Sequence, residues 1–420
     1  SFMPMKQVWP SETGHQWWAE LPQFSGFYMH TDYYFAELSG NWDMDGDGKA
    51  GEFGHYSTPV EPYTKTGDFG TSPEGEHGID RDHEVIVGRI PFYPGVSTAH
   101  DDLVGILNKT IDYQSALGTE IDWRKQVLLM TEHPNQHFFG EQIRNQVLSQ
   151  ASDVDSYRVY NADCLTPTDT CSPAITEPNY QLDTECNYNT ATSRWAQETP
   201  GVVSWFAHGG PTGAIGIFNI HNIPSLDKDN GIVVREINDT PAFTFQASCL
   251  TAKPTHSNNL AYELLKKGGI ATIGATHAAY GPYIEVPMAN SGSLIGMAYE
   301  YIKSLVVERM PAGDALYDVK KRIPIQNHFW HYWVNMTLFN LYGDPEVGLY
   351  DHQIQYIFEL EPLANQQLEV GTTFSLALEV TTQAPSYDVA FSEKPDWLSF
   401  DSHTLVLSGT PTEDDIGQHP

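Results

Sequence analysis

The chain has 420 residues, of which 40% are hydrophobic and 12% aromatic, and its 54 Asp and Glu against 22 Lys and Arg give a formal net charge of −32. This apolar content supports packed cores and excludes wholesale disorder, and no run of about 18 apolar residues predicts a membrane span. The acidic balance disfavours nucleic acid and anionic lipid as partners, because phosphates would be repelled. It fits a protein that tolerates salt or binds cations.

The ends of the sequence predict a fragment of a longer precursor. The start, Ser1-Phe2-Met3-Pro4, resembles neither a translation start nor a signal peptide, and the chain ends within a strand-rich region. We therefore expect that a pro-segment or further surface domains lie outside it.

An acidic loop near the N-terminus predicts a calcium site. Its carboxylates alternate around turn-forming glycines, a spacing that converges hard oxygens on Ca²⁺. The loop is EF-like but embedded in another fold, since its last acid falls at position 10 rather than 12 and no flanking helices are evident. A solvated acidic turn is the alternative. Calcium outside cells would suit such a loop, so we expect an exported protein, extracellular or on the cell surface. The expected ligands are Asp43, Asp45, Asp47, Glu52 and the carbonyl of Lys49.

Further along the chain, short apolar runs alternate with segments of helical periodicity. This alternation predicts an α/β fold with a mostly parallel sheet covered by helices on both faces. We expect strands at 84–88, 127–130, 202–206, 242–245 and 270–274, and helices at 101–117, 142–148, 259–267 and 291–307.

Three of the four cysteines, Cys164, Cys171 and Cys186, lie in a polar stretch at 161–192 that predicts a long surface loop. Two of them would form a disulfide in an oxidising compartment. Zinc is the alternative, although no Cys-x-x-Cys pair supports it.

The fourth cysteine and one histidine each follow an apolar strand. His208 follows residues 202–206, and Cys249 follows the run that begins at 242. Parallel strands would bring both to the carboxyl edge of the sheet, where α/β folds bind ligands. An imidazole beside a thiol lowers its pKa or acts as its base, and later protonates the leaving amine. The N–H groups of Gly209 and Cys249 are candidates for the oxyanion hole. An inert buried cysteine and a polar strand cap are the alternatives.

Several segments resemble the gingipain-like cysteine peptidases of the caspase-haemoglobinase fold, over about residues 25–350. They are 31–38, 82–91, 268–274 and 338–345, with the His-Gly and Ser-Cys pairs. The resemblance implies a caspase-like three-layer sandwich of two subdomains, with Cys249 as nucleophile and His208 as general base and acid. It also implies that Glu132, after the strand 127–130, orients the histidine, with an exposed strand-end glutamate as the alternative.

The same resemblance implies a pocket for the residue before the scissile bond, P1. Family members specific for basic P1 carry a pocket acid, which this sequence does not align clearly. Glu141 is the candidate acid and Tyr280 the candidate wall aromatic, with a surface helix position and packing as their alternatives.

After Tyr350 the pattern changes to period-2 alternation, as in residues 373–380, which predicts an all-β segment. Residues 394–400 and 407–411 resemble the cadherin-like or Ig-like domains of bacterial surface proteins. We therefore expect an N-terminal peptidase subdomain at 1–125, a catalytic subdomain at 126–352 and a partial β domain at 353–420.

Together these features predict a secreted or surface cysteine endopeptidase that cleaves proteins or peptides through a thioester acyl-enzyme, by analogy after basic P1 residues. Two alternatives remain. One is a catalytically inactive, calcium-stabilised surface adhesin, and the other is a transpeptidase with a peptidase fold.

Overall fold

The structure is a computed structural model in which the chain divides into two compact units, residues 1–351 and 352–420. No helix among the residues it describes is long and apolar enough to cross a membrane. The described residues are 3–9, 28–43, 46, 48–51, 79, 81–132, 138–161, 183–223, 240–281, 287–323, 330–350, 358–360, 366–382, 389, 391, 394–402 and 404–417. The expected boundary between subdomains at 125 and 126 falls inside the first unit.

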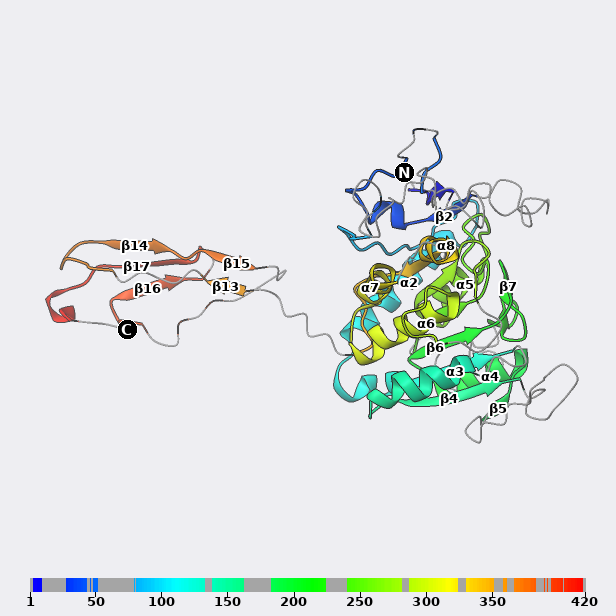
Figure 1. The fold of residues 1–420 in the computed structure, drawn as a ribbon. Helices are drawn as coiled ribbons and strands as arrows, with labels where there is room; N and C mark the ends of the chain where they lie inside the picture. Colours follow the sequence, from blue (N-terminus) through cyan, green and yellow to red (C-terminus); the bar gives the residue numbers. More distant parts are fainter. Residues whose placement is uncertain are drawn as a thin grey trace, which may run out of the picture. The chain divides into compact units, whose positions relative to one another are not determined.

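The first unit is built on a seven-stranded sheet with the order β12-β11-β10-β6-β3-β4-β5. Three of these strands, β4, β5 and β6, are labelled in Figure 1. Every neighbouring pair is parallel except β12 with β11. This confirms the predicted α/β fold with a mostly parallel sheet. The strands are β3 (Gln126–Thr131), β4 (Asp155–Tyr160), β5 (Thr184–Glu185), β6 (Val202–Phe206), β10 (Ala242–Ala247), β11 (Gly269–Ala275) and β12 (Phe339–Gly343).

Helices cover both faces of the sheet, which explains why the central strands are apolar throughout rather than alternating. In β3, Leu128 and Met130 pack on one face, where α4 (Tyr188–Glu198) and α5 (Leu260–Lys267) contribute to the core. Val127 and Leu129 pack on the opposite face. The helices of that face are α3 (Phe138–Gln142), α6 (Leu294–Ile302), α7 (Ala312–Arg322) and α8 (Trp330–Leu338). A further helix, α2 (Ala99–Ser115), packs against α5 and β11.

Local sequence sets where these helices begin. The side chain of Asn259 accepts a hydrogen bond from the Tyr262 N–H and caps α5, and Ser293 caps α6 in the same way. The helix expected at 291–307 ends as a π-helical turn, Lys303–Val307. The helix expected at 142–148 is also irregular, because α3 runs into a π-helical turn, Ile143–Val147, and a 3-10 turn, Leu148–Gln150.

The strand expected at 84–88 is wrong. This segment joins the sheet only at Arg89, through a single parallel bridge to Tyr342 of the edge strand β12. A Cβ at Gly88 would lie 2.5 Å from the Gly343 carbonyl oxygen and 2.7 Å from Pro345, so the chain packs across the end of β12 instead of along it. Of the apolar residues in this run, Ile86 and Val87 are partly buried against the core and Val85 is exposed.

Two small antiparallel sheets flank the large one. β1 (Lys6–Val8) pairs with β2 (Met29–Thr31), next to the short 3-10 turn η2 (Tyr33–Phe35). β7 (Gly209–Gly210), β8 (Gly213–Ala214) and β9 (Phe218–Asn219) form a tight meander directly after β6. This meander brings Gly216 next to the end of β3, as described below.

The second unit is all-β in its described part. β13 (Phe358–Leu360) pairs with β15 (Val380–Thr382), and β14 (Phe374–Ala377), β16 (Leu398–Asp401) and β17 (Val406–Gly409) form a three-stranded antiparallel sheet. Exposure alternates along β14 and β16, as the period-2 pattern predicts.

Candidate active site

The parallel strands β6 and β10 bring the segments that carry His208 and Cys249 to the same edge of the sheet. Ala247 pairs with Phe206 at their carboxyl ends. The ladder ends at this pair, and the chain turns at Ser248, whose N–H donates to the Gln246 carbonyl oxygen at 2.7 Å. Beyond the turn, the backbone of Gly209, next to His208, approaches the backbone of Cys249.

A buried serine holds these two strand ends together. The Ser248 hydroxyl donates to the Ala207 carbonyl oxygen at 2.7 Å and accepts from Trp205 Nε1 at 3.1 Å. Ser248 precedes Cys249 and Ala207 precedes His208, so these two bonds fix the distance between the candidate nucleophile and the candidate base. The serine is only 1% exposed, which keeps water from competing for the bonds.

Close backbone packing continues one residue beyond the histidine. A Cβ at Gly209 would lie 2.4 Å from the Cys249 carbonyl oxygen and 3.0 Å from the Cys249 nitrogen, whereas one at Gly210 would meet nothing within 4 Å. Only glycine fits at 209 without a shift of the backbone. The backbones of the two expected oxyanion donors, Gly209 and Cys249, are therefore in contact.

The Cys249 thiol is half-buried and faces the loop after β11. Its sulfur accepts a hydrogen bond from the Ala279 N–H at 3.4 Å and lies 3.7 Å from the Ala279 carbonyl oxygen. Burial raises the pKa of the Cys249 thiol, and the Ala279 N–H opposes this only in part. The resting group is therefore a thiol that needs a base. The next residue, Leu250, has φ 64, a left-handed conformation that is unfavourable for leucine and typical of functional turns.

Glu132 lies on the other side of the histidine's strand. β6 is sandwiched between β10 and β3, and Thr131 at the end of β3 pairs with Phe206. Glu132 follows Thr131 and packs against the meander, where a Cβ at Gly216 would lie 2.1 Å from its Cγ. The meander itself binds the histidine backbone, because the Ile215 N–H donates to the His208 carbonyl oxygen at 2.8 Å.

Comparison with known proteins decides the family. A model described as "Peptidase family C25" matches residues 3–350, which include Glu132, His208 and Cys249. The chain belongs to peptidase family C25. This confirms the resemblance to the gingipain family, and membership supports a cysteine peptidase.

Other comparisons concern the second unit and the fold. A model described as "Putative Ig domain" matches residues 357–420, in agreement with the expected Ig-like segment. A solved structure described as "Structure of Protease" is similar with 12% sequence identity and a TM-score of 0.45, over 91% of this chain and 72% of that chain. No curated protein matches the chain.

In this C25 peptidase, Tyr280 lies beside the nucleophile. Its backbone is clamped by Asn335, whose side chain accepts from the Tyr280 N–H at 2.9 Å and donates to the Tyr280 carbonyl oxygen at 2.7 Å. Burial raises the pKa of Tyr280, and Cys249 adds to the effect. Its role as a wall of the P1 pocket stays a prediction. The sequence did not indicate a role for Ala279 or Asn335. Ala279 contacts the Cys249 sulfur through its backbone N–H, and Asn335 holds the Tyr280 backbone from α8.

The other pocket candidate, Glu141, is engaged elsewhere. It is buried at the start of α3, where its carboxylate accepts from Tyr160 at 3.2 Å and pairs with Arg158 at 3.4 Å. Burial raises its pKa, against the pull of Arg158 and Tyr160. Because Arg158 already compensates the charge of Glu141, this carboxylate would bind the side chain of a basic P1 residue only weakly.

The sequence did not indicate that two histidines, His30 and His277, lie near Lys253, close to the nucleophile loop. Lys253, four residues after Cys249, lies near His30 of β2 and His277. Burial, then Lys253, lowers the pKa of His30, and burial, Lys253 and His30 lower that of His277 to about 4. The cluster is tied to the nucleophile loop, because the Leu250 N–H donates to the His277 carbonyl oxygen at 3.0 Å. Only tertiary folding brings β2 here, so no local pattern signals it.

Of the other predicted residues, the structure describes Asp43, Lys49 and Cys186. In the acidic loop, the Asp43 carboxylate accepts from the Gly46 and Gly48 N–H groups at 2.9 and 3.1 Å, and Lys49 is also described. Asp45, Asp47 and Glu52 lie outside the described residues, as do Cys164 and Cys171. Cys186 carries a free, buried thiol whose pKa burial raises, and it lies 3.7 Å from the Gly216 carbonyl oxygen.

Proposed function

We propose that this chain is a cysteine endopeptidase in which Cys249 is the nucleophile and His208 the general base and acid. The observation that carries the proposal is the close approach of the Gly209 and Cys249 backbones where the parallel strands β6 and β10 end, which brings the segments of His208 and Cys249 together at the carboxyl edge of the sheet. The serine bridge between the two strand ends supports it, because catalysis needs a fixed distance between the two groups.

The raised pKa of the buried thiol defines the first step. The imidazole of His208 takes the Cys249 proton as the sulfur attacks the carbonyl carbon of the scissile bond. Collapse of the tetrahedral intermediate breaks the C–N bond, and the imidazolium gives its proton to the leaving amine. Water, deprotonated by the same imidazole, then hydrolyses the thioester and regenerates the thiol.

Two further roles follow from the surroundings of the pair. The N–H groups of Gly209 and Cys249 would stabilise the oxyanion, in keeping with the close approach of the two backbones. Glu132, at the end of the neighbouring strand, would orient the imidazole and stabilise its charged form.

Cleavage after basic P1 residues is the finer part of this proposal. It rests on analogy within the family. Tyr280, which follows Ala279 at the Cys249 sulfur, is the candidate wall of the P1 pocket. The ion pair between Glu141 and Arg158 argues that another group would have to supply the acid.

The test is cleavage of a mixed-sequence peptide library at neutral pH with calcium and a reductant. Cleavage by the full chain that disappears in a Cys249→Ala variant with an unchanged circular dichroism spectrum would support the proposal, and the cut sites would report P1. A folded, reduced chain that cleaves nothing would favour the adhesin. Joined peptides in the presence of an amine acceptor would favour the transpeptidase.

Calcium binding and export are proposals of the same kind. The Asp43 carboxylate closes a turn over two glycine N–H groups, and Gly46 and Gly48 have positive φ, as tight metal loops require. We expect millimolar Ca²⁺, but not Mg²⁺, to raise the melting temperature, and EGTA to reverse the effect. Equal melting temperatures with Ca²⁺, with Mg²⁺ and with EGTA would argue that the acidic loop is a solvated turn without bound calcium. Recovery of the native protein outside its cells would test export.

A further inference from the structure

A buried asparagine of α8 holds the loop that faces the nucleophile. Asn335 is 0% exposed, and its side-chain amide uses its acceptor and both of its donors. Oδ1 accepts from the Tyr280 N–H at 2.9 Å, and Nδ2 donates to the carbonyl oxygens of Tyr280 and Gly292 at 2.7 and 2.9 Å. A buried amide that gave up these bonds would stay unsatisfied, which is costly, so Asn335 fixes the loop backbone at Tyr280.

The peptide unit that joins Ala279 to Tyr280 lies between this asparagine and the nucleophile. Its N–H belongs to Tyr280 and donates to Asn335 Oδ1, whereas its carbonyl oxygen belongs to Ala279 and lies 3.7 Å from the Cys249 sulfur. In a planar trans peptide unit the C=O and N–H groups point in opposite directions. A rotation of this unit that breaks one contact therefore breaks the other. Through this rigid unit, the position of Asn335 sets the place of the Ala279 carbonyl oxygen beside the thiol.

Ala279 offers the sulfur a hydrogen-bond partner in both of its protonation states. The thiol can donate to the Ala279 carbonyl oxygen, although a thiol is a weak donor. The thiolate can only accept, and the Ala279 N–H, 3.4 Å from the sulfur, is already placed to donate to it. Burial raises the pKa of Cys249, and this N–H opposes that rise. The sulfur therefore keeps one position before and after it gives up its proton.

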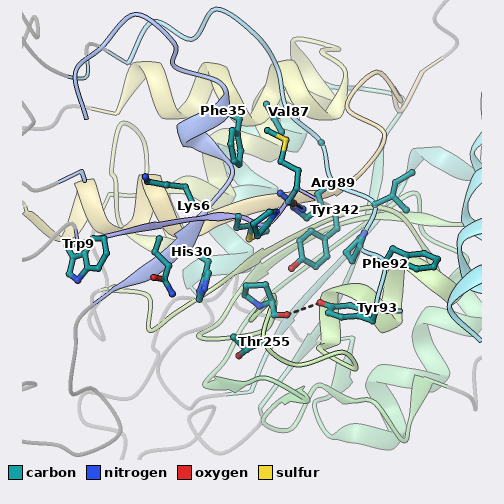
Figure 2. Close-up of a pocket in the computed structure, with 18 of the residues that line it drawn as sticks. Lys6, Trp9, His30, Phe35, Val87, Arg89, Phe92, Tyr93, Thr255 and Tyr342 are labelled. Carbon is teal, nitrogen blue, oxygen red and sulfur yellow. Dashed lines mark hydrogen bonds between the residues drawn. The ribbon is translucent and has the colours of Figure 1, made fainter. Parts of the chain in front are cut away.

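Other groups hold the rest of the nucleophile loop. The Tyr93 hydroxyl donates to the Pro254 carbonyl oxygen at 3.3 Å, the dashed line in Figure 2. The Tyr342 hydroxyl donates to the Ala252 carbonyl oxygen at 3.0 Å. Both tyrosines line the pocket that Figure 2 shows. These bonds fix the loop backbone, so a change at Asn335 acts on the sulfur of the nucleophile and leaves the loop after it in place.

We propose that Asn335 is a positioning residue for the nucleophile. By holding the Ala279–Tyr280 peptide unit, it keeps the Cys249 sulfur aligned for proton transfer and attack. This inference rests on the proposed function and adds to it a residue that acts only through its neighbours. The same bonds hold Tyr280, the candidate wall of the P1 pocket, so one side chain aligns this wall with the nucleophile.

The test compares Asn335→Ala with Asn340→Ala in the full chain. Asn340 is the matched control, because it is also buried and its amide also bonds to the backbone. It accepts from the Asp32 N–H at 2.7 Å and donates to the Leu338 carbonyl oxygen at 2.9 Å. Both variants lose a buried amide, so we expect similar falls in melting temperature. Where Asn335→Ala does not fold, Asn335→Asp is measured instead, since it keeps the size and the acceptor for Tyr280 and loses the amide donors.

The first readout needs no substrate, so it separates this inference from the proposed function. The pH profile of Cys249 alkylation by iodoacetamide, followed by peptide mass mapping, should move to higher pH in Asn335→Ala, because the thiolate loses a hydrogen bond that stabilises it. The profile should stay in place in Asn340→Ala. This result would support the inference even if the wild-type chain cleaves nothing. A profile of Asn335→Ala that stays in place or moves to lower pH, or an equal shift in both variants, would overturn it even if the chain is an active peptidase.

The second readout is cleavage of the best peptide substrate by the folded variants. We expect kcat to fall about 100-fold in Asn335→Ala, as for a displacement of about 1 Å between reacting groups, and to stay near the wild-type value in Asn340→Ala. Equal kcat values for the two variants would contradict the inference.

Discussion

Gly209→Ala is the substitution that most directly perturbs the pairing of His208 with Cys249. The added Cβ would lie 2.4 Å from the Cys249 carbonyl oxygen and 2.7 Å from Ser248 Cβ, whereas ordinary contact begins at 3.4 Å. The obstructing atoms are backbone and Cβ atoms, so the two strand ends must move apart by about 1 Å. A misplacement of that size costs about 100-fold in rate, or roughly 2.7 kcal/mol of transition-state stabilisation. Overpacking should also lower the free energy of unfolding by about 1–3 kcal/mol.

Gly210→Ala is the matched control, because a Cβ there would meet nothing within 4 Å and neither glycine has a positive φ. The assay is kcat/KM on the best peptide substrate, with thermal unfolding of both variants measured in parallel. We expect a loss of about 100-fold for Gly209→Ala at a temperature where it is folded, and near wild-type activity for Gly210→Ala. Equal activities of the two variants would refute the claim that the His208–Cys249 spacing depends on this contact.

Three further predictions concern other parts of the first unit. Gly216→Ala places a Cβ 2.1 Å from Glu132 Cγ and should lower kcat by displacing this carboxylate. Adding Glu132→Gln to this variant should lower kcat no further. An additive loss of kcat in the double variant would exclude an orienting role for the carboxylate. Because burial raises the pKa of Cys249, its alkylation by iodoacetamide, followed by peptide mass mapping, should still accelerate above pH 8.5, and a plateau below pH 7 would contradict the buried-thiol environment. Burial lowers the pKa of Lys109 to about 7, whereas the unfolded chain keeps that proton to about pH 10.4. Between these pH values the unfolded state binds more protons than the folded state, so the free energy of unfolding, measured with urea, should rise with pH. Lys109→Met should reduce this slope. An unchanged slope in the variant would contradict the lowered pKa of Lys109.

Much of the fold was predictable because it rests on local patterns. The strands predicted at 202–206 and 242–245 form because their residues are buried on both faces of the sheet, and His208 and Cys249 follow shortly after the strands end. The strand predicted at 84–88 was wrong, because the segment makes only one bridge to β12 and none of its residues is buried, with Val85 43% exposed. A short apolar run alone does not distinguish a buried strand from a partly exposed extended segment at the edge of a sheet.

The surroundings of the nucleophile were less predictable, because residues far apart in sequence form them. Ala279 contributes only backbone atoms, and Asn335 reaches Tyr280 from α8. His30 arrives from β2 and meets Lys253 through tertiary packing. None of these residues belongs to a periodic or spaced motif, so their roles emerge only once the sheet is assembled.

The most direct test of the central claim is covalent labelling with a peptidyl chloromethyl ketone followed by mass mapping. The reagent alkylates a nucleophile only where substrate binding and a base are combined. We expect one adduct, on Cys249, and a labelling rate that falls by at least about 100-fold in a folded His208→Ala variant. Labelling of another residue, or labelling of Cys249 at the same rate without His208, would contradict the pairing of these two groups.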